Sequence, residues 1–240
     1  MRGPAVLGGL LACAAAVATP NAASQGADAM LTACPGGQAW LAAEQARHAS
    51  LRLPPESPPK RPPVRDELLR MQRDDQAARA AFGQGRAPTR AEETVLVDTD
   101  ARHLRRLKAI IGDGGFPAAA DVGRDGVAAA WLLVQHADAD PGFQQRILSG
   151  LEGLGEADGI SGEQVALLTD RVLLAQGKPQ RYGSQYQGNP GEPPSMRPVE
   201  DPAGLDERRA RMHMMPSATY ACFLSRMSMG HAAPAEQTTP

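Results

Sequence analysis

One apolar segment constrains the fold more than any other part of the chain. Between Gly126 and Ala137, the eight consecutive residues from Val127 to Val134 are all apolar. A helix that is apolar on every face is stable only when other elements surround it. We therefore predict a central, buried helix here, around which the rest of a domain packs.

Further helices are indicated on both sides of this segment. Runs without internal Gly or Pro favour helices over Asp66–Phe82 and Glu92–Ile111. Asp140 followed by Pro141 is typical of an N-cap and a first helical residue, and Ser161 with Gln164 is typical of a capping box. Two shorter helices are predicted over Leu205–Met212 and Ser217–Ser225.

The overall composition agrees with a helical fold. No segment alternates between apolar and polar residues for long enough to predict a sheet. Apolar residues make up 42% of the chain but aromatic residues only 4%, so the core must be mainly aliphatic, which suits packed helices. The predicted fold is all-α: a compact, bundle-like domain of about six to eight helices, preceded by a signal peptide and a proline-rich linker.

Changes in composition along the chain predict its domain organisation. A stretch with six prolines is best interpreted as an extended linker, and the segment Gly188–Pro202 as a surface loop. The predicted parts are a signal peptide (1–18), an N-terminal helical segment (19–52), the proline-rich linker (53–63), a helical domain (64–228) and a disordered tail (229–240).

The first residues are typical of a bacterial export signal. Arg2 supplies a positive charge, Val6–Ala18 is apolar but too short to span a bilayer, and Ala16-Val17-Ala18 suits a signal peptidase. An alternative is a lipoprotein signal at Leu10–Cys13, which would anchor the mature chain through lipidated Cys13. We expect the cleaved form, in the periplasm or outside the cell, and no transmembrane segment.

Cleavage of this signal would leave two cysteines, Cys34 and Cys222. A pair of cysteines in an oxidising compartment usually forms a disulfide. We predict a Cys34–Cys222 bridge between the first helix and the last, with two separate buried thiols as the alternative.

The balance of charges excludes one class of partner. The chain has 25 basic and 27 acidic residues, and no segment concentrates one sign. A nucleic-acid-binding protein normally carries a basic stripe, and the short cluster Arg102–Lys108 is not enough. We predict no nucleic-acid partner, and leave open a small ligand or a protein of the cell envelope.

The first candidate site closes the apolar helix, at Gln135-His136-Ala137-Asp138. A histidine at a helix C-terminus is favoured when protonated, because the helix dipole is negative there. Asp138 could hold one ring nitrogen of His136, so that the pair acts as a general base and its orienting group. The pair could equally cap the helix.

The second candidate is the pair Asp170-Arg171 within the apolar run Val165–Ala175. Adjacent helical residues point about 100° apart, so each charge needs its own partner. Arg171 could stabilise an anion. The candidate partners of Asp170 are Arg73, Arg79, His136, Arg208 and Arg209.

The third candidate is the segment Gly177–Gln185, where Gln180, Tyr182 and Gln185 could line a ligand pocket or satisfy the backbone of their own loop. Tyr182 could also donate a proton. The chain has no nucleophile elbow, phosphate loop or zinc spacing, and we predict no cofactor and no metal. The two metal alternatives are a hard ion at His136, Asp138 and Asp140, and copper at Met212, Met214, Met215, Met227 and Met229 with His213 and His231.

The order of these motifs resembles a bacterial family known as domain of unknown function 6624. The motifs are Asp75-Gln76 with Arg79, Gly115-Phe116-Pro117, Gln135–Asp138, Asp170-Arg171-Val172, Pro179–Gln185, and Asp206–Arg209 with Tyr220, within Asp66–Ala221. The resemblance implies that the separated polar motifs converge between helices. The expected cluster is Asp75, Gln76, Arg79, His136, Asp138, Asp170, Arg171, Gln180, Tyr182 and Gln185, with Gln135 as a further ligand-binding candidate.

Three functions remain open at this point. The cluster could bind a small ligand or partner through a polar cleft, act as a hydrolase with His136 as general base and Asp138 or Asp170 as its orienting group, or only hold the helices together. A site requires His136 or Tyr182 to be open to solvent, whereas a structural network requires both to be sealed and hydrogen-bonded.

Overall fold

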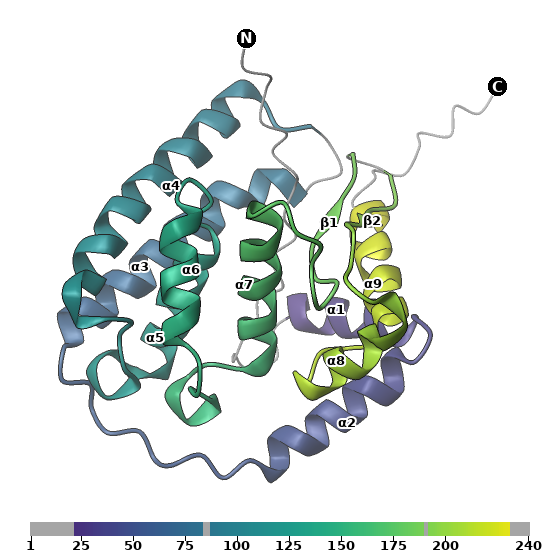
Figure 1. Cartoon of the computed structure of the whole chain (residues 1–240), viewed down its shortest axis with the longest axis horizontal. Helices are drawn as coiled ribbons and strands as arrows, with labels where there is room; N and C mark the ends of the chain where they lie inside the picture. The colour runs from purple at the N-terminus through teal and green to yellow at the C-terminus, as the bar shows by residue number, and fades with distance from the viewer. Residues whose placement is uncertain (1–21, 84–86, 190–191, 231–240) are drawn as a thin grey trace.

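The computed structural model describes residues 22–83, 87–189 and 192–230, and it is predominantly helical (Figure 1). The predicted signal peptide, the lipidation alternative at Cys13, His231 and residues 231–240 of the predicted tail lie outside the described residues. The helices are α1 (Ala22–Thr32), α2 (Gly37–Ser50), α3 (Pro62–Arg79), α4 (Arg90–Ile111), α5 (Ala119–Gln135), α6 (Pro141–Gly150), α7 (Gly162–Ala175), α8 (Leu205–Arg211) and α9 (Ser217–Gly230). The prediction of an all-α fold is confirmed, and no described helix is both long and apolar enough to span a membrane.

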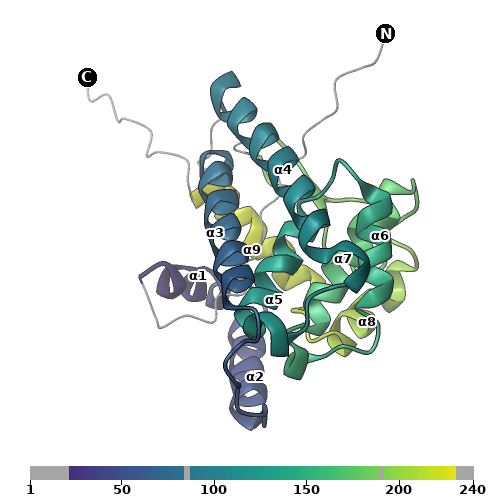
Figure 2. The same ribbon diagram turned by 90° about the vertical axis from the view of Figure 1, so that its left-hand side faces the viewer.

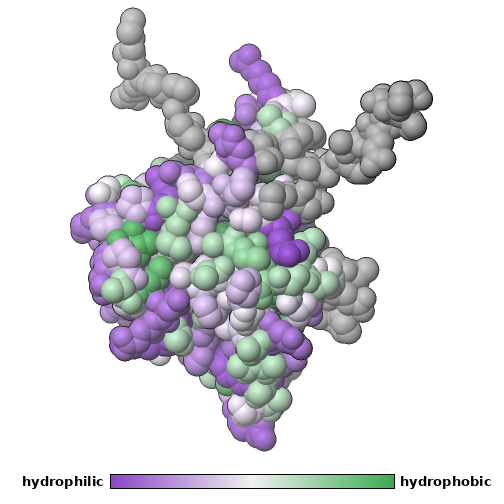
Figure 3. Space-filling model, turned by 90° about the vertical axis from the view of Figure 1, so that its right-hand side faces the viewer, coloured by the Kyte–Doolittle hydropathy of each residue, from purple (hydrophilic) through white to green (hydrophobic). Residues whose placement is uncertain are grey.

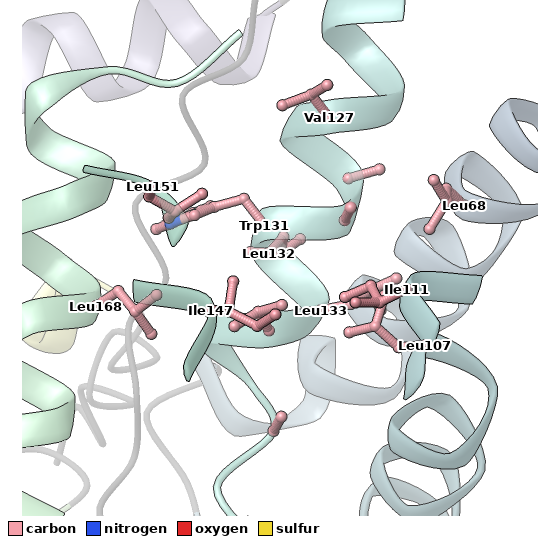
Figure 4. Packing of buried hydrophobic residues seen from close by; sticks show 14 of the residues in the cluster. Leu68, Leu107, Ile111, Val127, Trp131, Leu132, Leu133, Ile147, Leu151 and Leu168 are labelled. Carbon is pink, nitrogen blue, oxygen red and sulfur yellow. The ribbon is translucent and has the colours of Figure 1, made fainter. Parts of the chain in front are cut away.

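Helix α5 lies at the centre of the main core, as its sequence predicted. It contacts α3, α4, α6 and α7, and Val127, Trp131 and Val134 are all buried. Figure 4 shows Leu107 and Leu168 on opposite sides of α5, so that apolar residues surround it. Burying a large aliphatic side chain stabilises the fold by about 1.5–3 kcal/mol, and this core is the largest source of such burial.

Helix α5 starts seven residues before the predicted Gly126, and it is kinked. Gly123 has a φ of 73°, a left-handed conformation that interrupts the helix. After the kink, a side-chain oxygen of Asp125 accepts a hydrogen bond from the backbone N–H of Gly126 at 2.7 Å. A glycine adopts this conformation without the steric cost that a Cβ atom brings.

The local start signals of the later helices act as predicted. Asp140 accepts a hydrogen bond from the N–H of Phe143 at 2.9 Å, so it caps α6. Ser161 and Gln164 form both hydrogen bonds of a capping box at the start of α7. A second capping box, Thr89 with Glu92, starts α4 and was not predicted.

The predicted linker differs from the structure at its end. Pro62 and Pro63 form the first turn of α3, where a helix needs no backbone N–H donor. The extended part is also held in place, since the N–H groups of Lys60 and Arg61 donate to carbonyls at the start of α5. Residues 53–61 therefore follow the surface of the helical domain.

The segment Gly188–Pro202 was predicted as a loop, but it contains a strand. Strand β2 (Ser195–Met196) pairs antiparallel with β1 (Tyr186–Gln187). Strands of two residues are too short to produce an alternating pattern in the sequence. This hairpin lies between α7 and α9 in Figure 1.

A second, smaller core joins the two ends of the described chain. Leu31 of α1 packs with Tyr220 and Phe223 of α9. Cys34 and Cys222 form a disulfide across this contact, with their Cα atoms 5.8 Å apart. Of the methionines weighed as copper ligands, Met214 and Met215 are buried, and Met215 belongs to this core.

Candidate functional site

The polar residues that were expected to converge lie in two groups. Within the described residues, no hydrogen bond or ion pair joins the two groups. We call the first group the polar cluster: Asp75, Gln76, Arg79, Asp100, His136, Asp138 and Arg171. We call the second group the loop clamp: Asp170, Gln180 and Arg209, with the backbone of residues 181–185.

The centre of the polar cluster is a buried pair, Asp75 of α3 and His136 at the end of α5. The His136 Nδ1 atom lies 2.9 Å from both carboxylate oxygens of Asp75, and the two side chains are only 3% and 1% exposed. Arg79 Nε lies 3.2 Å from Asp75 Oδ1 and 2.9 Å from His136 Nδ1. Gln76 donates to Asp75 Oδ2 at 2.9 Å. Asp75 therefore receives donors from three side chains.

The charges of this pair decide which nitrogen of His136 carries the proton. Burial raises the pKa of Asp75, but the hydrogen bond from His136 and the positive charge of Arg79 outweigh it, so the pKa is lowered. Burial lowers the pKa of His136 despite the contact with Asp75, so the ring is neutral at pH 7. A carboxylate needs donors, so we assign the single ring proton to Nδ1; because a protonated Nδ1 accepts no hydrogen bond, the N–H of Arg79 Nε then donates to Asp75 Oδ1 and not to the ring. Nε2 then keeps its lone pair.

The prediction that Asp138 holds the ring of His136 is wrong. Arg171 Nη1 lies 2.7 Å from each carboxylate oxygen of Asp138, and His136 is held instead by Asp75. The physical reason is that α3 packs along α5, which brings Asp75 against the end of α5. The side chains of two residues that lie two positions apart at a helix end are not brought together by the packing of one helix on another.

Asp100 of α4 is a member of the cluster that the sequence did not indicate. Its Oδ1 atom accepts a hydrogen bond from Arg79 Nη2 at 2.6 Å. Burial, together with the negative charges of Asp75 and Asp138, raises the pKa of Asp100 to about 6, although Arg79 opposes the shift. Asp100 therefore changes its charge near pH 6.

Arg171 is a buried cation with few partners. Its side chain is 9% exposed, whereas its ion-pair partner Asp138 is 51% exposed. Within the described residues, Arg171 Nε is buried and has no hydrogen-bond partner. Within the same described residues, the Oε1 atoms of Gln135 and Gln144 are also buried and have no hydrogen-bond partner. The Nε2 atom of Gln144 donates to Asp138 Oδ1 at 3.2 Å. Arg171 and Gln144, which both donate to Asp138, therefore each keep a buried polar atom without a partner among the described residues.

Asp170 belongs to the loop clamp, and the predicted arginine or histidine partners are wrong for it. Its Oδ1 atom accepts from the backbone N–H groups of Arg181 and Tyr182 at 2.7 and 2.9 Å, and its Oδ2 atom accepts from Ser184 at 2.9 Å. Burial raises the pKa of Asp170 against these hydrogen bonds. The carboxylate thus holds three backbone donors of one loop.

The two glutamines of this loop also hold the backbone. Gln180 Oε1 accepts from the N–H of Gln185 at 2.8 Å, and Gln180 Nε2 donates to the carbonyls of Gln185 and Arg197 at 3.0 and 2.8 Å. Gln185 Nε2 donates to Ser184 Oγ at 3.1 Å. Of the two interpretations left open for this segment, these contacts match the one in which the loop satisfies its own backbone.

The buried guanidinium of Arg209 completes the loop clamp. It donates to the carbonyl oxygens of Tyr182 and Met215, both at 2.6 Å, and lies 5.0 Å from the ring centroid of Tyr220. Tyr182 itself is half-buried, and only its backbone atoms take part in the clamp. Of the two residues whose exposure was to separate a site from a network, His136 is sealed and Tyr182 is partly open.

The described residues contain no group of three or more His, Cys, Asp or Glu side chains placed to hold a metal ion. The fold and these polar groups define a helical domain with a buried carboxylate–histidine–arginine cluster beside a rigid loop. The chain belongs to a family of unknown function, domain of unknown function 6624, whose model matches residues 62–229. No curated protein and no solved structure matches it.

Proposed function

We propose that the polar cluster binds a small anionic ligand through Arg171. The observation that supports this proposal is the guanidinium of Arg171, which is buried but directs only one of its nitrogen atoms at a carboxylate. Burying a cation without full hydrogen bonding is costly. A carboxylate or phosphate accepts two parallel hydrogen bonds from a guanidinium and would satisfy it.

The electrostatic surroundings of Arg171 also favour an anion. The positive charges of Arg79 and Arg197 both act on Arg171, and Asp138 is the carboxylate that opposes them. Arg197 is exposed and forms no ion pair with a described residue. An anion that approaches beside Asp138 would therefore experience the positive charges of Arg171, Arg79 and Arg197.

Calorimetric titration at low salt tests this proposal, with acetate, succinate and inorganic phosphate as probes. We expect one of them to bind, and we expect Arg171→Lys to weaken that binding at least tenfold, because lysine keeps the charge but lacks the planar fork of donors. Arg211→Gln is the matched control, because Arg211 is exposed and pairs with Glu207 on α8.

Two outcomes would contradict the proposal. One is that no probe binds to the folded wild-type protein. The other is that Arg171→Lys, with an unchanged helical circular dichroism spectrum, binds the probes as well as the wild type does. Either result would favour a cluster that only fixes the packing of α3, α5 and α7.

A second candidate function is hydrolysis, with His136 as the general base. The contact that favours it is the hydrogen bond between Asp75 and His136 Nδ1, because a carboxylate on one ring nitrogen leaves the other able to accept a proton. Arg171 would then stabilise a developing anion. Hydrolysis of p-nitrophenyl acetate that is lost in both His136→Gln and Asp75→Asn, with the fold retained, would support this function.

We further propose that the protein acts after export, in the periplasm or outside the cell. The disulfide between Cys34 and Cys222 supports this, since such bonds persist in oxidising compartments. Cell fractionation tests the proposal. The protein should appear outside the cytoplasm without residues 1–18, and a lipid on Cys13 would instead support the anchored form.

A further inference from the structure

The junction of α5, α6 and α7 holds a second buried polar group that lacks a partner. The three helices contact one another there, and α6 and α7 lie side by side in Figures 1 and 2. Hydrophobic and hydrophilic residues are interspersed on the face of the molecule that carries α8 and α9 (Figure 3), so that face does not by itself define a site. The buried polar groups of the junction are more specific.

The side-chain amide of Gln144 on α6 has a fixed orientation. Its Nε2 atom donates to the backbone carbonyls of Val134 and Gln135 at 3.1 and 3.2 Å, and to Asp138 Oδ1 at 3.2 Å. All three partners are acceptors, so the nitrogen and the oxygen of the amide cannot be exchanged. The oxygen Oε1 is therefore the amide atom that is left for another partner.

The position of Gln144 at the end of α5 explains its nitrogen but not its oxygen. Nε2 satisfies two carbonyls at the C-terminus of α5, where a helix lacks partners of its own. Gln144 is only 1% exposed, and its Oε1 atom has no hydrogen-bond partner among the described residues. A buried acceptor without a donor is costly. This oxygen therefore favours a ligand that brings a hydrogen-bond donor.

Arg171 places an unpartnered donor near this acceptor. Arg171 Nη1 lies 2.7 Å from Asp138 Oδ1, which is the same oxygen that accepts from Gln144 Nε2. The Nε atom of Arg171 belongs to the same guanidinium as Nη1, and the Oε1 atom of Gln144 belongs to the same amide as Nε2. Both unpartnered atoms therefore lie near one carboxylate oxygen, and a small molecule with two polar groups can contact both.

The charges around Arg171 decide which kind of donor the ligand carries. Burial lowers the pKa of Arg171, and the positive charges of Arg79 and Arg197 lower it further, against the negative charge of Asp138. An ammonium group would meet the same positive charges, and Asp138 already pairs with Arg171. A hydroxyl group donates a hydrogen bond without adding a charge.

We propose that the ligand at Arg171 is a small 2-hydroxycarboxylate. Its carboxylate accepts hydrogen bonds from the guanidinium of Arg171, and its hydroxyl group donates to Gln144 Oε1. Gln144 then selects hydroxy acids from among other carboxylates. This inference rests on the anion site of the proposed function and adds the chemical class of its ligand.

Calorimetric titration with matched pairs of acids tests the proposal. Glycolate differs from acetate by one hydroxyl group, as malate differs from succinate, and glycine carries an ammonium group in place of the hydroxyl. We expect the hydroxy acid of at least one pair to bind the wild-type protein about tenfold more tightly than its parent acid, because it satisfies a buried acceptor. Glycine should bind more weakly than glycolate.

Variants of α6 and α7 assign this preference to Gln144. Gln144→Met removes the acceptor, so the hydroxy acid and its parent should bind this variant with equal affinity. Gln145→Met is the matched control, because Gln145 is the next residue of α6, is exposed and contacts Gln176. It should keep the preference of the wild type. Arg171→Lys should weaken both acids of a pair by the same factor.

The outcomes separate this inference from the anion site itself. If a parent acid or phosphate binds but neither hydroxy acid binds more tightly than its parent, the inference is overturned and the anion site stands. Tighter binding of glycine than of glycolate also overturns it, as does a preference retained in folded Gln144→Met. If no anion binds, the proposed function falls together with the inference. The wild-type comparison decides the ligand class even if Gln144→Met does not fold.

Discussion

At the scale of single residues, Asp100 gives a prediction about pH. Its pKa is about 6 in the folded protein and about 3.9 in an unfolded chain. Between these values the folded state binds more protons than the unfolded state, so the contribution of Asp100 to stability falls as the pH rises from 4 to 6. Above pH 7 this contribution is constant.

The measurement is urea denaturation of the wild type and of Asp100→Asn from pH 4.5 to 7.5. The free energy of unfolding of the variant should rise relative to the wild type by at most about 3 kcal/mol across the window, then stay level. Asp75 does not contribute to this change, because its pKa is lowered and its carboxylate takes up a proton only below this range of pH. Parallel curves for the two proteins would show that Asp100 has an ordinary pKa.

Single residues are also where prediction from the sequence was least complete. The resemblance to the family indicated most of the polar cluster, because its motifs carry Asp75, Arg79, His136 and Arg171. The predicted pairing of Asp138 with His136 was wrong. The partner of His136 depends on which helix packs against the end of α5, and no local sequence pattern encodes this packing. Asp100 had no signal, because it lies in a helix whose charged residues otherwise face solvent.

At the scale of secondary-structure elements, the carboxylate of Asp170 joins α7 to the loop that follows it. We expect Asp170→Asn to lower the free energy of unfolding by about 2–4 kcal/mol, because an amide cannot accept all three backbone N–H groups and places a donor against one of them. Thermal and urea denaturation measure this loss.

Asp138→Asn is the matched control, since Asp138 is half-exposed and its ion pair with Arg171 is open to water on one side. Asp138→Asn should lose less unfolding free energy than Asp170→Asn does. Equal stability of Asp170→Asn and the wild type would mean that the loop holds its conformation through Gln180 and Arg209 alone.

The helices themselves were predictable because their signals are local. A capping residue and a run of helix-forming residues act within a few positions, so α6 and α7 begin where the sequence indicates. The start of α3 and the kink in α5 were not predicted, because prolines in a first turn and a left-handed glycine both resemble helix breaks. The two-residue strands are set by pairing with each other, which no single segment shows.

At the scale of the whole molecule, the described chain has two cores that depend on different parts of the sequence. The main core contains residues of α3 to α7, whereas the smaller core joins α1 to α9. The resemblance to the family covered the main core but not α1. The attachment of the N-terminal helices therefore depends on the smaller core, on the Arg47–Glu156 ion pair and on the disulfide.

This arrangement predicts what loss of the disulfide does. Cys34 and Cys222 are 188 residues apart in the sequence, and a cross-link over so long a loop strongly restricts the unfolded chain. We expect the double variant Cys34→Ala/Cys222→Ala to lose about 2–5 kcal/mol of unfolding free energy.

Limited proteolysis should also cleave this variant near α1 and α2 before it cleaves α3 to α7, because the main core contains no residue of α1 or α2. A reducing agent should change the wild type in the same way and leave the double variant unchanged. Equal resistance of the oxidised wild type and the double variant to protease would show that the packing of Leu31 against α9 is sufficient to hold the N-terminal helices.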